Sequence, residues 1–505
     1  MSDKRTLIPD WAKRTAENLL VTHGEGPHVV VTGISPSGNI HVGNLREVLV
    51  GEAIANALKT CGVEVRFVFH ADTIDPLRKI APGVPGKYER YIGHSLSRIP
   101  DPEGCHASYT EHFLAPFEET LRRTEIDIEV LRSHQLYEGG FYAAVTQEAL
   151  LHTAKLREIL QEVSGRKMPK HWSPYLPRTT EGRLGGVRIL EHLPEENKVI
   201  FVDEDGWEDA ADYSKGEGKL SWRVELAARW KALRATFEPF GKDHTSRGGS
   251  TDTADRMAQE VFRYPVPGRY EYEWIQIKGR GAMSSSKGII LLPGELLEIM
   301  PPDALRRMVL GRDPGRALDL DLTNGFPRFM DEYQASIGEL TVPFTHLVTI
   351  SQTVRGDTDA AVEMLLQGGY GEAVSNREKL VENLAYAHNW AENWAPESLK
   401  LGVLELSAAA EAATSLNEAQ LQYLDEVAGS LESNMDADMV QSILYTKAVE
   451  RGLKPKQAFA AVYTVLLGRK SGPKAGPFIV SIGIWLAQQR FLGVIRNTMA
   501  GGVEG

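Results

Sequence analysis

Short β-type segments alternate with helical segments through the first 131 residues, and this alternation constrains the fold more than any other feature. Residues 29–31, 64–69 and 126–131 are rich in β-branched or aromatic residues and bounded by turn or charged residues, as strands are. Between them, residues 45–53 and 113–121 repeat apolar side chains at helical spacing. Strands and helices in this order predict a parallel sheet with helices on its faces, an α/β fold.

Changes in composition divide the 505-residue chain further. A Pro- and Gly-rich stretch interrupts the sheet, and we expect its second half to resume near residues 235–240 and to end with 273–277. Beyond about residue 320 the pattern becomes almost wholly helical. We therefore expect four segments: 1–164, first half of a Rossmann-like domain; 165–218, an inserted segment; 219–320, second half of that domain; 321–505, a helical region.

Composition excludes several classes of protein. Charged residues make up 25% and hydrophobic residues 42%, which are ordinary values for large globular cores. Cys61 and Cys105 cannot form a disulfide framework or a four-cysteine zinc site. The first residues have no apolar signal segment, and residues 478–487 are too short to span a bilayer. We therefore expect a cytoplasmic protein with no membrane partner.

Two segments carry the chemistry. Residues 32–44 read TGISPSGNIHVGN, a strand that leads through a Pro- and Gly-containing loop into a helix. A helix N-terminus suits phosphate, and His41 and Asn44 are donors at this opening. Residues 278–288 read KGRGAMSSSKG, which is typical of a mobile loop with hydroxyl and cationic groups. Each segment alone is compatible with an ordinary turn or a surface linker.

Taken together, the two segments closely resemble the paired signatures of class I aminoacyl-tRNA synthetases, His-Ile-Gly-His and Lys-Met-Ser-Lys-Ser. The variants found here, HVGN and MSSSKG, are similar to those of class I lysyl-tRNA synthetases. Other stretches agree with that family, including DPLRKI at 75–80, GKDH at 241–244 and GPKAGPF at 472–478. The resemblance spans nearly the whole chain.

The resemblance implies an enzyme that activates L-lysine with ATP and Mg²⁺ and transfers lysyl to the 2′-hydroxyl of tRNA(Lys). The implied catalytic residues are His41, Asn44 and Lys287. The implied ATP-binding residues are Pro36, Gly43, Asp243, Met283, Ser284, Ser285 and Ser286. The chain departs from the general class at Ala282 and Ser285, where the class has lysines, and Lys278 or Arg280 are alternative sources of the cation.

By the same resemblance, the lysine pocket comprises Gly33, Ser35, Trp222, His244 and Tyr272. Tyr270 is close enough in sequence to be an alternative to Tyr272. A buried ammonium needs a carboxylate or several acceptors, and the sequence leaves three carboxylates open: Glu47, Asp75 and Glu273.

We expect no metal site, because the inserted segment contains no cysteine and only His171 and His192. The resemblance assigns residues 165–218 to the acceptor end of the tRNA and residues 321–505 to stem contact and anticodon binding. The net charge of −12 argues against a nucleic-acid partner. Residues 447–474, however, contain seven Lys and Arg residues and only one acidic residue, Glu450, so this stretch can bind phosphates. Trp390, Trp394 and Phe459 are candidates for stacking on bases. We expect a monomer.

The sequence leaves two alternative functions open. One is a synthetase paralogue that adenylates lysine or another amino acid for a different acceptor. The other is a non-catalytic tRNA-binding derivative. The retained His41, Asn44 and Lys287 argue against the second, while Ala282 keeps the first open.

Overall fold

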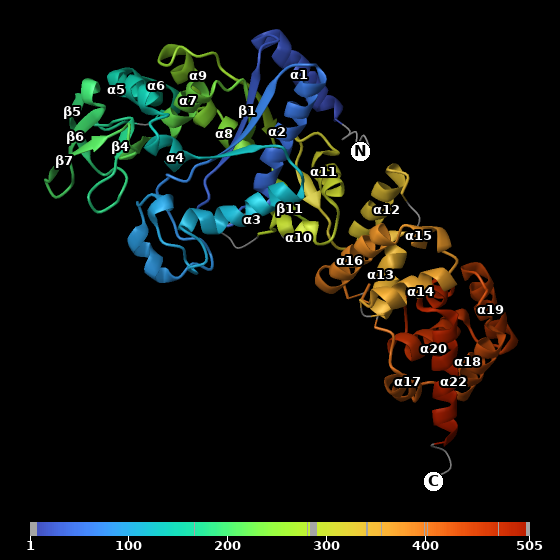
Figure 1. Cartoon of the computed structure of the whole chain (residues 1–505). Coiled ribbons are helices and arrows are strands. Elements are labelled where there is room, and N and C mark those ends of the chain that lie inside the picture. The colour runs from blue at the N-terminus through green and yellow to red at the C-terminus, as the bar shows by residue number, and fades with distance from the viewer. Residues whose placement is uncertain are drawn as a thin grey trace. The chain divides into compact units, whose positions relative to one another are not determined.

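The computed structural model describes residues 8–500, apart from 166, 280, 283–289, 340, 341, 355, 398, 401 and 473; for 282, 367 and 497–500 it describes the backbone alone. The chain forms two compact units. The first contains residues up to 297 together with 302–320, and the second contains 298–301 together with residues from 321 onward. Both are drawn in Figure 1.

The first unit is built around a five-stranded sheet in the order β10-β9-β1-β2-β3, with parallel pairing throughout. The strands are β1 (His28–Ile34), β2 (Val65–Ala71), β3 (Glu129–Arg132), β9 (Phe237–Gly241) and β10 (Gly268–Tyr272). The predicted α/β class with a parallel sheet is confirmed. β1 is the central strand and is buried over most of its length, so its carboxyl end opens at the middle of the sheet edge where ligands of such folds bind.

The helices of the first unit pack on and around this sheet (Figure 1). They are α1 (Asp10–His23), α2 (Val42–Thr60), α3 (Tyr109–Arg123), α4 (Ser133–Glu138), α5 (Ala143–Leu151), α6 (Thr153–Ser164), α7 (Trp222–Leu233), α8 (Lys242–Thr245), α9 (Ser250–Glu260), α10 (Pro293–Leu297) and α11 (Pro302–Leu310). The 3₁₀ turns are η1 (Gly86–Tyr91), η2 (Leu96–Arg98) and η3 (Pro194–Glu196).

α2 lies unusually close to the sheet. A Cβ added at Gly51 would come within 2.8 Å of the Phe67 ring and of Thr32 Cγ2. The absence of a side chain at Gly51 therefore lets α2 pack against β1 and β2. This close packing fixes the start of α2 relative to the carboxyl end of β1.

The Pro- and Gly-rich stretch forms small antiparallel sheets rather than part of the central one. β4 (Tyr175–Pro177) pairs with β8 (Gly218–Leu220), and β6 (Lys198–Val202) lies between β5 (Arg188–Leu193) and β7 (Glu208–Asp212). Val199, Phe201 and Ala211 are buried in a core that this stretch shares with Leu150 of α5.

One expectation about the sheet is wrong. The central sheet does not continue through residues 273–277: β11 (Ile275–Ile277) belongs to a separate sheet with β12 (Gly281–Ala282) and β13 (Leu318–Leu320). The backbone leaves the central sheet after β10 because buried Arg46 binds it there. Its guanidinium donates to the carbonyl of Glu273 over 2.5 Å and to that of Arg316 over 3.0 Å.

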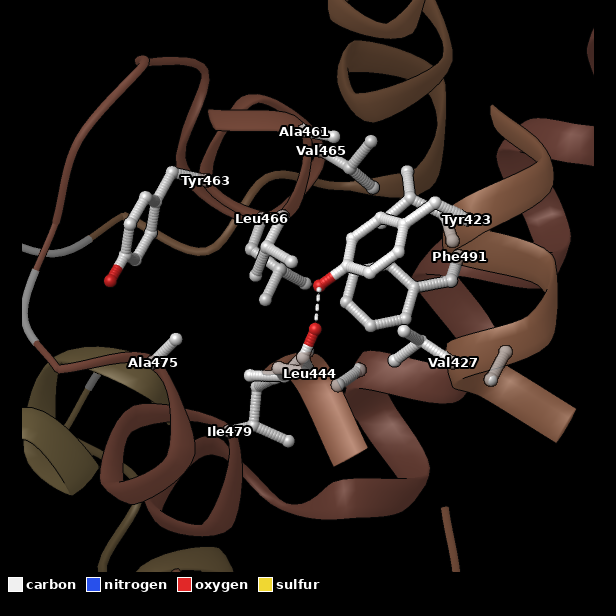
Figure 2. Packing of buried hydrophobic residues seen from close by; sticks show 14 of the residues in the cluster. Tyr423, Val427, Leu444, Ala461, Tyr463, Val465, Leu466, Ala475, Ile479 and Phe491 are labelled. Carbon is white, nitrogen blue, oxygen red and sulfur yellow. Dashed lines mark hydrogen bonds between the residues drawn. The ribbon is translucent and has the colours of Figure 1, made fainter. Parts of the chain in front are cut away.

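The described part of the second unit consists of helices and contains no strand. They are α12 (Phe326–Ser336), α13 (Phe344–Thr353), α14 (Thr358–Gln367), α15 (Gly371–Ser375), α16 (Arg377–Asn393), α17 (Leu406–Ala413), α18 (Glu418–Ser430), α19 (Ala437–Glu450), α20 (Pro455–Leu467), α21 (Ala475–Ile482) and α22 (Ile484–Ala500). Figure 2 shows part of their core, where Tyr423 donates to the carbonyl of Leu444 over 3.2 Å.

No single helix among the described residues is long and apolar enough to cross a membrane. α21 and α22 reach that length and composition only when taken together, and they meet at a bend of 99°. Phe478, Ile479 and Phe491 of this pair are buried in the core of the second unit.

Candidate active site

The first motif forms the N-terminus of α2. His41 is the N-cap residue with extended backbone, and its backbone N–H donates to Oδ1 of Asn44 over 3.1 Å. Because the amide oxygen of Asn44 is used in this way, its NH₂ group is the end left to donate. Gly43 is partly exposed between them. The helix start therefore combines N–H donors with a positive dipole end, which suits phosphate oxygens.

The imidazole of His41 is neutral at pH 7, since burial lowers its pKa. Its Nδ1 is buried and has no hydrogen-bond partner among the described residues. A neutral imidazole has one N–H donor and one acceptor nitrogen. His41 can therefore donate a hydrogen bond to a phosphate oxygen, but it does not add a positive charge.

The second motif lies mostly outside the described residues, and this applies to Met283, Ser284, Ser285, Ser286 and Lys287. The chain on either side is described. β12 ends at Ala282, and the carbonyl of Leu291 accepts a hydrogen bond from the backbone N–H of Val42 over 2.9 Å. The segment that follows the second motif is thus attached to the first residue of α2.

Two predicted pocket residues meet at Glu47, which lies on the second turn of α2. The backbone N–H of Gly33 donates to its Oε1 over 2.8 Å, and the hydroxyl of Tyr272 donates to its Oε2 over 2.6 Å. Tyr270, the alternative tyrosine, instead binds Asp313 over 2.5 Å. Of the two tyrosines, Tyr272 is therefore the one that joins the strand-end cluster.

A second group of predicted pocket residues lies around Arg229 of α7. The ring of Trp222 is 6.1 Å from that of His244, and the guanidinium carbon of Arg229 lies 5.7 Å from the Trp222 ring centroid. Arg229 also approaches Gly33, because a Cβ at Gly33 would lie 3.1 Å from its Nη1. A glycine at the end of β1 thus leaves space for Arg229, which links the two groups.

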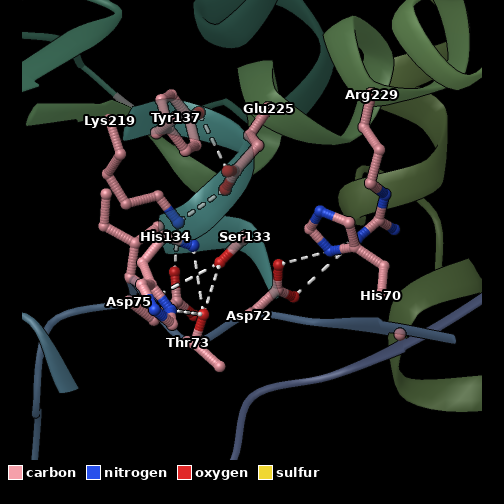
Figure 3. A network of polar contacts seen from close by, with 12 residues as sticks. His70, Asp72, Thr73, Asp75, Ser133, His134, Tyr137, Lys219, Glu225 and Arg229 are labelled. Atoms are coloured by element: carbon pink, nitrogen blue, oxygen red, sulfur yellow. Dashed lines mark hydrogen bonds and ion pairs between the residues drawn. The ribbon is translucent and has the colours of Figure 1, made fainter. Parts of the chain in front are cut away.

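Arg229 and Lys219 belong to a buried network of charges behind these residues (Figure 3). Arg229 pairs with Glu238 over 2.5 Å and lies 3.8 Å from Asp72. In the adjoining part, Lys219 pairs with Asp75 and, over 2.5 Å, with Glu225. Asp72 also lies 2.9 Å from the ring of His70, so four carboxylates share three basic side chains in this network.

The remaining predicted residues lie at the carboxyl ends of the strands. Ser35 is partly buried and Pro36 is buried, just beyond β1. Asp243 is exposed at the end of β9, and a Cβ at Gly241 would lie 2.7 Å from its Oδ1 and 3.5 Å from the Tyr272 ring. Asp243 is thus beside Tyr272, at the edge of the sheet that α2 also faces.

Comparison with known proteins identifies the family of this chain. The family model for class I tRNA synthetases (K) matches residues 9–350. The chain belongs to the class I tRNA synthetase (K) family. Three proteins named lysine–tRNA ligase are similar across nearly their whole length. That of Archaeoglobus fulgidus is 38% identical (95% of this chain and 99% of that protein). That of Methanosarcina acetivorans is 35% identical (93% and 96%), and that of Thermoplasma acidophilum 34% (96% and 99%).

The synthetase also contains a cluster of metal-type ligands that the sequence reasoning did not single out. Asp101, Cys105, His106 and His112 each offer one ligand atom, and these atoms lie within 4.8 Å of one another. Carboxylate, thiolate and imidazole groups in a set of four are donors that zinc accepts. The signal was the spacing D-x₃-CH-x₅-H, which a count of cysteines overlooks. We refer to these four residues as the metal-donor cluster.

The helical region of the synthetase corrects one predicted RNA contact. Trp390 is fully buried, stacks on Phe326 with ring centroids 5.9 Å apart and donates to the carbonyl of Leu322. It is therefore a core residue and has no free face for a base. Trp394 is partly exposed, and Phe459 packs against Tyr445, which is 47% exposed.

The basic stretch of the synthetase is also more neutralised than the sequence suggests. Acidic residues from neighbouring helices pair with it: Arg451 binds Glu426, and Lys474 lies 3.6 Å from Asp438. Lys447 pairs with Glu450 over 2.7 Å. The expectation that Glu450 alone opposes these cations is wrong, because helices distant in sequence pack beside them.

Proposed function

We propose that this synthetase is a lysine–tRNA ligase that activates L-lysine with ATP and transfers lysyl to the 2′-hydroxyl of the terminal adenosine of tRNA(Lys). One observation carries the proposal. Glu47 of α2, the helix that starts with the phosphate-binding motif, hydrogen-bonds both Gly33 and Tyr272 of the predicted lysine pocket. The same helix thus carries the predicted phosphate-binding residues at its start and the carboxylate that contacts the predicted lysine pocket.

In the first step, a carboxylate oxygen of lysine attacks the α-phosphorus of ATP. The new O–P bond forms as the bond from the α-phosphorus to the bridging oxygen breaks, and pyrophosphate leaves. Such a reaction depends on positioning and charge stabilisation more than on covalent help from the protein. The amide NH₂ of Asn44 and the imidazole N–H of His41 donate to phosphate oxygens, and Gly43 lets the nucleotide approach the backbone.

Nucleotide binding uses further residues around the helix start. Pro36 shapes the loop after β1, and Asp243 accepts hydrogen bonds from the ribose hydroxyls. The family resemblance also assigns Met283, Ser284, Ser285, Ser286 and Lys287 to ATP, with Lys287 as the source of a cation; these residues lie outside the described part of the chain. Mg²⁺ bound together with ATP would supply neutralisation of charge on the phosphates.

The amino acid lies between the two groups of pocket residues. Gly33 and Ser35 contact its backbone end, and Trp222, His244 and Tyr272 surround its aliphatic stem. An aromatic face attracts an ammonium by roughly 0.5–2 kcal/mol, depending on desolvation. In the second step, the 2′-hydroxyl of the terminal adenosine attacks the carbonyl carbon of lysyl-adenylate, and AMP leaves.

Contacts with tRNA are assigned to the other segments. Residues 165–218 receive the acceptor end, and residues 321–505 bind the stem and the anticodon. Phe459 and Trp394 remain candidates for stacking on unpaired bases, and Tyr445, which forms an aromatic pair with Phe459, replaces Trp390. We also propose that the protein acts as a monomer in the cytoplasm.

Lysine-dependent exchange of pyrophosphate into ATP, measured with each amino acid in turn and followed by charging of tRNA transcripts, tests this function. The proposal requires exchange with lysine and lysylation of tRNA(Lys). Exchange without charging would indicate a paralogue with another acceptor, and tRNA binding without exchange would indicate a non-catalytic derivative. Ala282→Lys restores the first lysine of the general class motif and tests whether this position limits the rate.

A further inference from the structure

The loop that follows β2 carries a concentration of positive charge that the proposed function leaves unassigned. Residues 76–98 contain one acidic residue, Glu89, in a chain whose net charge is −12. They contain five Lys or Arg residues, and all five are exposed: Arg78, Lys79, Lys87, Arg90 and Arg98. We refer to residues 76–98 as the basic loop; it is drawn in blue beside α3 in Figure 1.

Most of these cations are not neutralised by the protein itself. Among the residues that the structure describes, Arg98 is the one member of the five that forms an ion pair, with Glu138 over 3.1 Å. The guanidinium carbon of Arg90 lies 4.7 Å from the centroid of the Tyr91 ring, a contact that leaves its charge in place. Lys and Arg side chains in this condition are available to the phosphates of a nucleic acid.

Backbone hydrogen bonds join the basic loop to the inserted segment. The N–H of Gly93 donates to the carbonyl of Leu77, and the N–H of Leu184 donates to that of Gly93, both over 2.8 Å. This pairing brings Arg183 alongside, because its Cγ would lie 3.7 Å from a Cβ at Gly93. Arg183 is exposed and has no acidic partner in the described part of the chain, so it extends the positive surface onto the inserted segment.

A small core fixes the shape of the basic loop. Leu77, Ala81, Tyr88 and Leu96 of the loop are buried together with Tyr109 of α3. Because this packing holds the backbone, the cations lie on a preorganised surface, and less conformational freedom is lost when a ligand binds there.

The basic loop also contacts the first motif, so it lies beside the predicted site. It begins just beyond the carboxyl end of β2, the strand that pairs with β1. A Cβ at Gly38 would lie 3.0 Å from the Cβ of Ala81 in the loop. The hydroxyl of Tyr109, which packs against the loop, donates to the carbonyl of Ser37 over 3.1 Å. A nucleic-acid strand bound along the basic loop therefore leads to the segment between β1 and α2.

Another exposed part of the inserted segment has the opposite charge. Residues 203–209, at the turn between β6 and β7, contain five acidic residues and no Lys or Arg. Trp207 in this turn is 75% exposed, but the carboxylates around it repel phosphates. The inserted segment thus offers RNA a favourable surface at Arg183 and an unfavourable one at this turn.

On the basis of the proposed function, we propose that the basic loop and Arg183 bind the phosphates of the acceptor end of the tRNA. Phosphate contacts fix the register and orientation of a nucleic acid and do not read its sequence directly. The basic loop therefore guides the terminal adenosine toward the first motif and leaves the choice among tRNAs to other contacts.

The test compares the full-length wild-type protein with a variant that combines Arg78→Gln, Lys79→Gln and Arg183→Gln. These side chains are exposed, so the variant should fold. We expect KM for a tRNA(Lys) transcript in lysylation to rise roughly 10- to 50-fold near about 0.15 M salt, while kcat at saturating tRNA stays within about threefold. The slope of log affinity against log salt should fall by about two to three, since each phosphate contact contributes about 0.7–0.9.

Phosphate-ethylation interference on the same transcript locates the contact. Binding to the wild type should be sensitive to ethylation at the acceptor end, and the triple variant should lose this sensitivity while keeping that of other arms. The combination of Arg78→Lys and Arg183→Lys preserves both charges and should keep KM for tRNA within about threefold, which a purely structural role of the guanidinium groups would not predict.

A second triple variant, Lys59→Gln, Arg66→Gln and Arg122→Gln, is the matched control. It removes the same charge at exposed positions near the ends of α2 and α3 and the start of β2, which lie at the opposite edge of the sheet. The ion pairs that it removes are exposed and contribute little to stability. KM for tRNA and the interference pattern should not change.

The outcomes separate this proposal from the proposed function. A wild-type protein that neither binds nor lysylates tRNA(Lys) would overturn the function and the proposal with it. An active wild type whose basic-loop variant keeps its KM, salt dependence and acceptor-end interference would overturn the proposal alone. An equal rise in KM in the control variant would show an effect of net charge and would also overturn the proposal.

Discussion

Replacing Asn44 with aspartate separates the observed cap of α2 from the proposed contact of this side chain with phosphate. The amide oxygen caps α2 by accepting from the His41 N–H over 3.1 Å, and an aspartate oxygen can accept the same bond. A negative charge in the first turn of a helix is itself favourable by about 0.3–1 kcal/mol. We therefore expect Asn44→Asp to fold with undiminished stability.

In Asn44→Asp, the end of the side chain that would face phosphate loses its hydrogen-bond donor. Aspartate replaces the NH₂ donor with a second oxygen, and loss of one preorganised donor typically costs 10²- to 10³-fold in rate. Repulsion of a carboxylate by a phosphate at about 4 Å adds about 1 kcal/mol in water and about 4 kcal/mol at an effective dielectric constant near 20. The two effects together predict a fall in kcat for lysine-dependent exchange of at least about 10³-fold.

The assay is pyrophosphate exchange at saturating lysine, with thermal unfolding measured on the same samples. Asn44→Ala should lose both roles, with about 1 kcal/mol less stability and a 10²- to 10³-fold lower rate. Asn417→Asp is a control for an aspartate introduced at a helix start, because Asn417 is the N-cap residue of α18 and its side-chain oxygen accepts from the Gln420 N–H over 2.9 Å. Asn44→Asp that exchanges within threefold of wild type would refute the donor role.

Three further perturbations test the surrounding structure. Arg229→Met should cost about 3–5 kcal/mol at pH 7 in urea unfolding, whereas exposed Arg328→Met should cost under about 0.5 kcal/mol. Burial alone would raise the pKa of Asp72, but His70, Arg229 and Lys219 hold it below its ordinary value. That stabilisation is present above about pH 4 and is lost as pH falls further, so the Arg229→Met deficit should shrink below about pH 4. Gly33→Ala should raise KM for lysine, as its Cβ would crowd Arg229. Zn²⁺ should raise the unfolding temperature through the metal-donor cluster, and Cys105→Ser should abolish this rise.

The sequence predicted the fold wherever local pattern and tertiary environment agree. Strand-like segments and the helix after Gly43 became β1, β2 and α2 because each is buried with the periodicity its side chains require. The end of the sheet was misplaced because the carbonyl of Glu273 binds Arg46, which is 227 positions away along the chain. A local pattern contains no information about such a contact.

Sequence by itself determined the family, the α/β class and the two motifs, since these depend on residues that are adjacent or regularly spaced. Only the tertiary structure decided which groups pair. It showed that Trp390 is a core residue, that Glu426 neutralises Arg451, and that Asp75 is already bound by a lysine while Glu47 is not. Charge pairing and burial depend on distances through space, and these are set when segments far apart in the chain pack together.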